Sequence, residues 1–351
     1  MHHPHTDIKS PNKLGTPVPL DLLIPDLLLP ADAPPPFREL RLPVLEKWLA
    51  SAEVTRVEAR SARDFLANAF GLPQPAPVAP VSLAGEGSTF EGPWLRADPV
   101  HVRVSPNGAT LHSAAVLDIG REEAEALTAA LSAQFAGDGL EFHAPSSDRW
   151  YVRVPRGEVP RTTPLDAALG RNAFALMPPA TPAINWPAVL TEVQMVLAAH
   201  EVNARREREQ RPAVNSVWLW GGGEAPVSVT SPYAAIYADE PFACGLGILA
   251  GTPPSKVPAG MNEVAGGAGA PSALVVIDTL TRATRRGDAE RWSEEANRLE
   301  SAWFAGFSAA LGRFGRVRAI LPGARGTLVA TLRKPPPWHW IRKPAALSTY
   351  A

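Results

Sequence analysis

The chain alternates between two hydrophobic periods, which predict a mixture of helices and strands. Residues 61–70 (SARDFLANAF) place apolar side chains at spacings of three and four, as in an amphipathic helix. Residues 100–104 (VHVRV) instead alternate apolar and polar side chains, as in a half-buried strand. Residues 273–278 (ALVVID) form a short, almost wholly apolar run, which is typical of a strand buried on both faces.

The first part of the chain predicts a strand followed by short helices. Residues 21–29 (DLLIPDLLL) indicate a buried strand that ends in a turn, and residues 43–49 indicate a helix. Residues 1–18 are polar and rich in Pro, Lys and His, so we expect a disordered tail. Residues 72–92 are rich in Pro, Ala, Gly and Ser and mark a candidate boundary. We therefore assign 19–92 to the first part of an α/β core.

A different pattern follows, with the order strand, strand, helix, strand, strand. This order predicts a small inserted α+β domain over residues 93–182. Its expected elements are two strands, a helix with acidic residues in its first turns, and two further strands, at 100–104, 112–117, 118–131, 140–142 and 149–154.

The rest of the chain alternates strands with helices, which predicts a largely parallel sheet. The expected helices are 186–207 and 289–311, and the expected strands are 215–223, 235–237, 273–278, 317–321 and 327–332. We assign 183–335 to the second part of the α/β core and 336–351 to a C-terminal tail. That tail carries Trp338 and Trp340 among basic residues. We expect the two indoles either to pack the tail against the rest of the chain or to contact a protein partner.

Composition narrows the classes of partner. The 351 residues include 34 basic and 35 acidic ones, so the net charge of −1 favours neither nucleic acid nor a membrane surface. No apolar run is long enough to cross a bilayer. Cys244 is the only cysteine, so no intramolecular disulfide can form, and its apolar neighbours indicate an unreactive thiol. These features predict a cytoplasmic protein.

Candidate chemistry gathers at strand ends, because ligands of open α/β sheets bind at the carboxyl ends of the strands. Asp26 and Asp278 end two buried strands, where they either converge on a metal or hydroxyl or cap the next segment. Trp220 precedes Gly221, Gly222 and Gly223, which form either a phosphate-binding loop or a turn beside the indole.

A second group of candidates lies around the helix at 186–207. Asn203 and Arg205, with Asn215 after them, suit contact with an anion, although a solvated helix face explains the arginine equally well. His200 on the same helix is most simply a packing residue, and Asp288 a helix N-cap. His101, His112 and His143 show no metal-ligand spacing, so we expect no zinc site.

Several stretches resemble the archaeal-type cofactor-independent phosphoglycerate mutases of the alkaline phosphatase superfamily. The resemblance lies in RWYVRVP at 149–155, HEVNAR at 200–205, PAVN at 212–215, WLWGGG at 218–223, and the segment from LAG at 249–251 to GM at 260–261. More closely, the chain resembles the proteobacterial RpfE-type regulatory proteins. The resemblance implies an alkaline-phosphatase-like α/β fold with a mostly parallel sheet flanked by helices and an inserted smaller α+β domain.

The departures from the mutases bear on activity. That family holds two divalent metals with Asp and His ligands and uses a serine nucleophile. The stretch 278–288 (DTLTRATRRGD), where the family places histidines, has none and carries three arginines. We therefore expect a non-catalytic, ligand-binding or regulatory protein without catalytic residues or a cofactor, which binds an anionic metabolite or a protein partner. The alternative is a metal-dependent mutase or phosphatase with rearranged ligands for Mn²⁺ or Mg²⁺.

Overall fold

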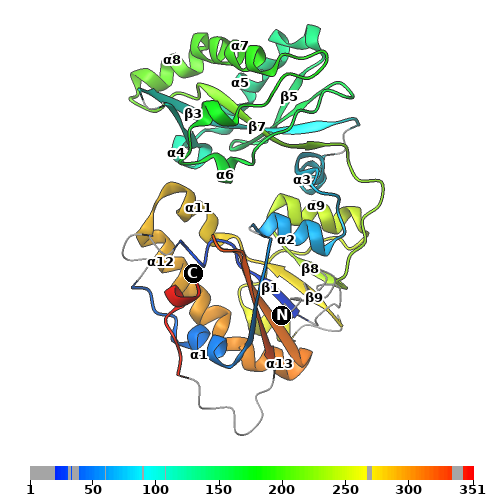
Figure 1. Ribbon diagram of the computed structural model, residues 1–351, viewed down its shortest axis with the longest axis vertical. Coiled ribbons are helices and arrows are strands. Elements are labelled where there is room, and N and C mark those ends of the chain that lie inside the picture. The colour runs from blue at the N-terminus through cyan, green and yellow to red at the C-terminus, as the bar shows by residue number, and fades with distance from the viewer. Residues whose placement is uncertain are drawn as a thin grey trace, which may run out of the picture.

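The computed structural model consists of two units stacked along the long axis of the molecule (Figure 1). The structure describes residues 20–30, 33, 39–59, 61–88, 91–106, 108–266, 271–333 and 343–351. The larger unit surrounds a six-stranded sheet and the smaller unit a five-stranded sheet. The chain starts the larger unit, builds the smaller one and then returns, so the smaller unit is an insertion.

The larger sheet has the strand order β2-β11-β10-β1-β9-β8. Four neighbours are parallel, namely β10 (Arg316–Leu321), β1 (Leu20–Leu23), β9 (Ala273–Val276) and β8 (Ala235–Tyr237). One edge is extended by two antiparallel strands, β11 (Thr327–Arg333) and β2 (Glu53–Val57). Within β1, Leu22 packs on one face and Leu23 on the other, as expected for a sheet buried on both sides.

Helices cover both faces of this sheet. One face packs against α1 (Pro43–Ser51), α10 (Met261–Gly266), α12 (Ala289–Ala302) and α13 (Phe307–Phe314). The other packs against α2 (Ala62–Ala69), α3 (Val78–Gly85) and α9 (Pro241–Leu249). The apolar cluster on this second face continues into the smaller unit through Trp218 and Trp220. The remaining helix, α11 (Thr279–Arg286), follows β9 and lies at the end of the larger unit that faces the smaller one (Figure 1).

The smaller sheet has the order β4-β3-β6-β5, and β7 also pairs with β3. Its strands are β3 (Trp94–Ser105), β4 (Gly108–Ser113), β5 (Glu141–Ser146), β6 (Arg149–Arg153) and β7 (Ser216–Gly223). One face buries its apolar side chains against α5 (Arg121–Gln134), α7 (Trp186–Ala199) and α8 (Glu201–Arg208). Two short helices, α4 (Ala114–Leu117) and α6 (Leu165–Ala168), lie on the side toward the larger unit (Figure 1). Short 3₁₀ helices occupy Ala136–Asp138, Ala173–Leu176, Phe304–Gly306 and Leu347–Tyr350.

The inserted unit extends past residue 182, where the sequence analysis placed its end. β7 pairs with β3 rather than with the larger sheet, and α7 and α8 pack on the smaller sheet, so the insertion runs to Gly223. Two expected long helices are each interrupted. The helix expected at 186–207 breaks at His200, and the one expected at 289–311 becomes α12 and α13 with a 3₁₀ turn between them.

Two expectations lie outside the described residues, namely the disordered tail at 1–18 and the packed Trp338 and Trp340. Within the part of the chain that the structure describes, every helix is too short or too polar to cross a membrane.

Candidate ligand cleft between the two units

Asp26 and Asp278 follow two neighbouring strands that end at the same edge of the larger sheet. β1 and β9 are parallel neighbours with Leu23 opposite Val276, so the residues that follow the two strands emerge at the same edge. Asp26 takes a left-handed backbone conformation, with φ of 61°. Its carbonyl oxygen accepts a hydrogen bond from the Trp292 indole at 2.8 Å, which fixes the turn against α12.

The two carboxyl groups have different electrostatic surroundings. Burial raises the pKa of Asp26, while a hydrogen bond with Thr281 and the charges of Arg285 and Arg63 lower it in part. Burial and then the negative charge of Glu240 raise the pKa of Asp278 to about 6. Asp26 therefore faces the arginine-rich side of the edge, and Asp278 faces an acidic one.

Beside Asp26, one carboxylate of the smaller unit is held by two arginines of the larger unit. Asp166 in α6 forms ion pairs with Arg63 in α2 and with Arg285 in α11, the latter at 3.1 Å. Burial alone would raise the pKa of Asp166, but the charges of Arg63 and Arg285 outweigh it and lower the pKa to about 2. We call these three residues the Asp166 triad.

A second pair lies deeper, within the smaller unit. The Arg96 guanidinium donates from Nε to Asp98 Oδ1 at 3.0 Å, and the Trp220 indole donates to Asp98 Oδ2 at 2.7 Å. Arg63 of the larger unit lies over the Trp220 ring at 4.7 Å, and Arg96 lies over the same ring at 5.2 Å. Trp220 therefore connects the Arg96–Asp98 pair to the Asp166 triad.

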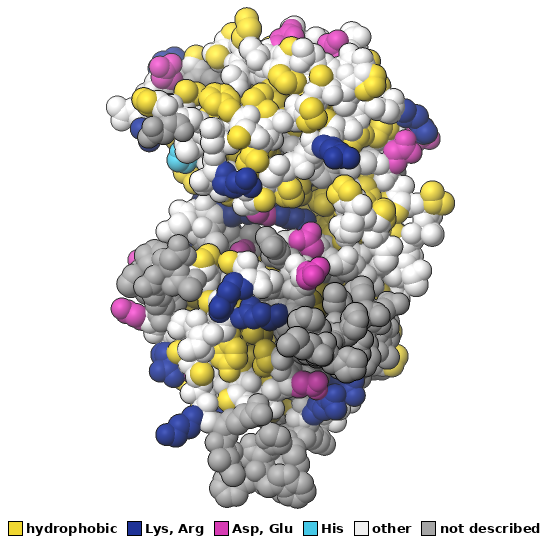
Figure 2. Space-filling view, in the orientation of Figure 1, with side chains coloured by type: hydrophobic (Ala, Val, Ile, Leu, Met, Phe, Trp, Pro, Cys, Tyr) yellow, Lys and Arg dark blue, Asp and Glu magenta, His cyan; other side chains and the backbone are white. Residues whose placement is uncertain are grey.

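A third pair joins α3 to the smaller sheet. Arg149 donates from Nε to Glu86 at 2.6 Å, and the Tyr151 hydroxyl donates to the same carboxylate at 3.3 Å. Figure 2 shows acidic and basic side chains gathered in a hollow where the two units meet. We call this hollow the cleft, and ion pairs between guanidinium and carboxylate groups join the two units around it.

The three glycines after Trp220 serve packing. They end β7 in the smaller sheet, which corrects the expectation that they follow a strand of the larger sheet. A Cβ on Gly221 would lie 2.9 Å from Val78 Cβ, and one on Gly222 would lie 2.5 Å from Leu95 Cδ2. The absent side chains let β7 lie close to α3 and β3, so this segment is not an open phosphate-binding loop.

The expected anion contacts on α8 also have structural partners. Asn203 is buried and donates to the carbonyl oxygens of Leu197 and Val214, at 2.7 and 2.8 Å. Asn215 exchanges two hydrogen bonds with the backbone of Val102, at 2.7 and 3.0 Å. Arg205 is exposed, and its nearest carboxylate, Glu123, is 3.6 Å away. The two asparagines therefore hold the smaller unit together, and Arg205 lies on its surface.

The donors present do not fit the two-metal centre that the mutase resemblance implies. Among the described residues, no group of three or more His, Cys, Asp or Glu side chains is placed to hold a metal ion. His200 lies in the smaller unit and accepts the Val202 N–H at 3.1 Å, and Asp288 caps α12 by accepting the Arg291 N–H at 2.9 Å. Neither joins Asp26 and Asp278 as a ligand.

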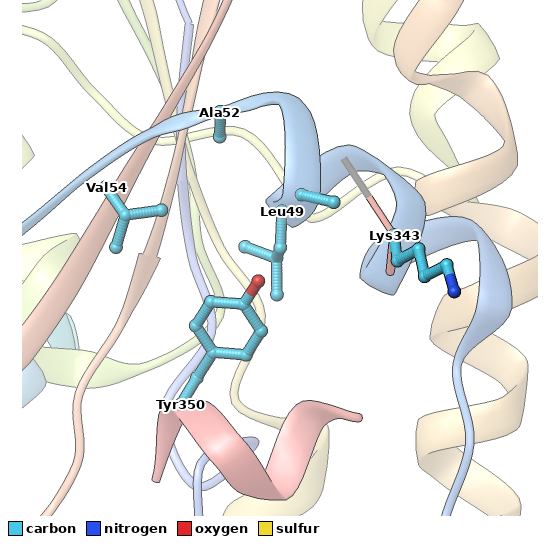
Figure 3. Close-up of a pocket in the computed structure, with 6 residues that line it drawn as sticks. Leu49, Ala52, Val54, Lys343 and Tyr350 are labelled. Atoms are coloured by element: carbon cyan, nitrogen blue, oxygen red, sulfur yellow. The ribbon is translucent and has the colours of Figure 1, made fainter. Parts of the chain in front are cut away.

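Two other features have no evident chemistry. The Cys244 thiol contacts the Ala238 carbonyl oxygen at 3.3 Å, and burial followed by the charge of Glu240 raises its pKa to about 12, which disfavours the reactive thiolate. A recess of about 490 Å³ near the chain end is lined by Leu49, Ala50, Ala52, Val54, Lys343 and Tyr350. Figure 3 shows the Tyr350 side chain directed toward Leu49, and polar atoms of Tyr350 and Lys343 line the recess together with apolar side chains.

Comparison with known proteins relates the chain to the phosphoglycerate mutases. No family profile matches the sequence. It is 27% identical over 187 residues to the 2,3-bisphosphoglycerate-independent phosphoglycerate mutase of Methanosarcina barkeri, a match that covers 48% of this chain and 46% of that protein. The mutase of Methanosarcina acetivorans is 27% identical over 179 residues, covering 48% and 45%. The chain thus matches about half the length of these curated relatives.

Two solved structures are similar. A protein from Pyrococcus horikoshii has a TM-score of 0.50 at 11% identity, with 90% of this chain and 88% of that chain covered. The cofactor-independent phosphoglycerate mutase of Thermoplasma acidophilum has a TM-score of 0.37 at 16% identity, with 90% of each chain covered. The expected fold class is confirmed: a mostly parallel α/β core flanked by helices, related to the cofactor-independent phosphoglycerate mutases.

Proposed function

We propose that this protein binds an anionic small metabolite in a regulatory role, on a mutase-like scaffold that does not carry out two-metal phosphoryl transfer. The observation that supports this is the Asp166 triad at the edge of the larger sheet. Arg285 lies in the stretch where the mutases place histidines, and it faces Asp26 and Asp166. Guanidinium groups bind phosphate and carboxylate in a bidentate manner, but they cannot activate a nucleophile as a metal does.

The RpfE-type regulatory proteins are the group that this proposal favours. In this chain His200 and Asp288, which could have served as metal donors, act as helix caps. The alternative, a metal-dependent mutase or phosphatase with rearranged ligands, draws on the position of Asp26 and Asp278 after two strands that end at one sheet edge.

Binding of 3-phosphoglycerate to the full chain, measured by titration calorimetry, tests the proposal. Arg285→Gln removes a side chain that is 36% exposed in the cleft, and we expect it to weaken binding about tenfold or more, because charge-assisted hydrogen bonds are lost. Arg298→Gln is the matched control, since Arg298 pairs with Glu295 on the exposed side of α12 and should leave binding unchanged.

Activity assays with Mn²⁺ and Mg²⁺ test the alternative. We expect no sustained conversion of 3-phosphoglycerate and no phosphatase turnover with either ion. Turnover that requires a metal and is abolished by Asp26→Ala or Asp278→Ala would overturn the proposed function in favour of the enzyme.

A further inference from the structure

The Asp166 triad couples the two units through side chains that solvent can reach. The Asp166 and Arg285 side chains are 43% and 36% exposed, and Arg63 is 19% exposed. Asp166 belongs to the smaller unit and both arginines belong to the larger one. The triad is therefore a bridge between the units that a dissolved ion can enter.

The charges of the triad do not balance. Two guanidinium groups share one carboxylate, so one positive charge within the triad is uncompensated. This arrangement has the charge and the donors of a site for a phosphate or carboxylate group.

We propose that Arg63 and Arg285 form an anion subsite that the chain's own Asp166 occupies, so that a phosphate or carboxylate ligand must displace Asp166 and thereby loosens the contact between the two units. This inference rests on the proposed function and assigns to it a site and a mode of regulation. Asp166 can occupy the subsite because its carboxylate is itself an anion of the kind that the two arginines bind. Because Asp166 is part of α6, its carboxylate is held close to the arginines at a high effective concentration.

The helix that carries Arg285, α11, has a second contact with the smaller unit, and this contact predicts which segment moves when Asp166 is displaced. Arg286, next to Arg285 in α11, donates to the carbonyl oxygen of Ala115 at 2.6 Å and pairs with Asp118 at 3.3 Å. These contacts join α11 to the α4 region of the smaller unit without using Asp166. Displacing Asp166 should therefore release α6 first, while α11 stays attached near α4.

Asp166→Asn in the full-length protein tests the subsite, with inorganic phosphate as the probe. Without its competitor the subsite should bind phosphate about tenfold more tightly, because two partly exposed ion pairs no longer oppose binding. Asp166→Glu keeps the charge and should bind phosphate as the wild type does. Glu125→Gln is the matched control, since it breaks the Arg121–Glu125 pair within α5, away from the cleft.

Hydrogen exchange gives a readout that does not depend on affinity. Amide exchange in residues 164–169 should quicken in Asp166→Asn, and in wild type on addition of phosphate, with exchange in α5 unchanged. Equal phosphate affinity in wild type and Asp166→Asn, or phosphate that slows exchange in this segment, would overturn the inference. Metal-dependent turnover would instead overturn the proposed function, so the two failures are distinguishable.

Discussion

Gly245→Ala should destabilise the protein strongly, because α9 crosses α3 at a distance that leaves no room for a side chain. A Cβ on Gly245 would lie 1.7 Å from the carbonyl oxygen of Val81, and one on Gly85 would lie 1.9 Å from that of Pro241. Carbon and oxygen atoms normally stay about 3.3 Å apart, so the helices would have to separate by about 1.5 Å. Both obstructing atoms are backbone and cannot rotate away.

The magnitude follows from two opposing terms. Replacing glycine by alanine inside a helix gains about 1 kcal/mol of helix propensity. Overpacking of a well-packed contact typically costs about 1–3 kcal/mol, and a backbone collision of this size lies at or above the upper end. We expect Gly245→Ala to lower the free energy of unfolding by about 2–4 kcal/mol.

Gly312→Ala in α13 is the matched control, because a Cβ there has nothing within 4 Å. Gly312→Ala should raise the free energy of unfolding by about 0.5–1 kcal/mol, because it gains helix propensity without a collision. Urea unfolding followed by both circular dichroism and tryptophan fluorescence measures both variants and tests whether the units unfold together. Equal effects of the same sign in the two variants would refute the packing argument.

Three further predictions concern other contacts. The pKa of Asp278 is raised from 3.8 to about 6, so its ionisation disfavours the folded state as pH rises through this window. Asp278→Asn should therefore stabilise the protein by up to about 3 kcal/mol near pH 7 and by much less near pH 4. Thermal unfolding of both proteins at each pH measures the difference. Arg318 donates a hydrogen bond to the buried Asp21, so Arg318→Met should lower the free energy of unfolding by about 3–5 kcal/mol, and the double variant Asp21→Leu/Arg318→Met should lower it by less. An equal or larger decrease in the double variant would contradict the argument that the unpaired buried charge causes the effect. Ser61 forms a capping box on α2, so Ser61→Ala should cost about 1 kcal/mol by urea unfolding, and no loss would show that the cap is dispensable.

The elements that the sequence predicted well are those whose local pattern matches their environment. β9 is an apolar run because both of its faces are buried, and α2 carries an apolar stripe because one side faces the core. The parallel pairing of β1 and β9 places the ends of both strands, which Asp26 and Asp278 follow, at the same sheet edge.

The elements that the sequence missed have patterns set by distant contacts. α3 lies in a segment rich in Pro, Ala and Gly that reads as a linker, yet it forms a helix because α9, β3 and β7 surround it. β2 has mostly exposed residues and exists because β11 offers an unpaired edge. The sheet to which β7 belongs depends on its pairing with β3, more than 100 positions earlier in the chain, which no local pattern encodes.

The same limit applies to the cleft. Arg63 and Asp166 are 103 positions apart, and neither belongs to a motif or a hydrophobic period. The sequence singled out Arg285 only because it lies in the stretch where the phosphoglycerate mutases have histidines. Asn203 showed the opposite error. Its residue type suggested ligand contact, but its side-chain amide forms hydrogen bonds with the backbone of Val214, in the segment that connects α8 to β7.

The electrostatics of the sheet edge explain why an anion suits one part of it better than a pair of metal ions. Burial and the negative charges of Glu240 and Asp239 raise the pKa of Asp278, and the positive charge of Arg285 lowers it only in part. Arg285 in α11 and Arg63 in α2 supply fixed positive charge that lowers the pKa of Asp166 to about 2. A divalent ion between Asp26 and Asp278 would have to tolerate these guanidinium groups, whereas an anion beside them would gain from both. The arrangement of charges therefore separates a carboxyl group of raised pKa from a pair of guanidinium groups, and the proposed phosphate or carboxylate ligand would contact the guanidinium groups.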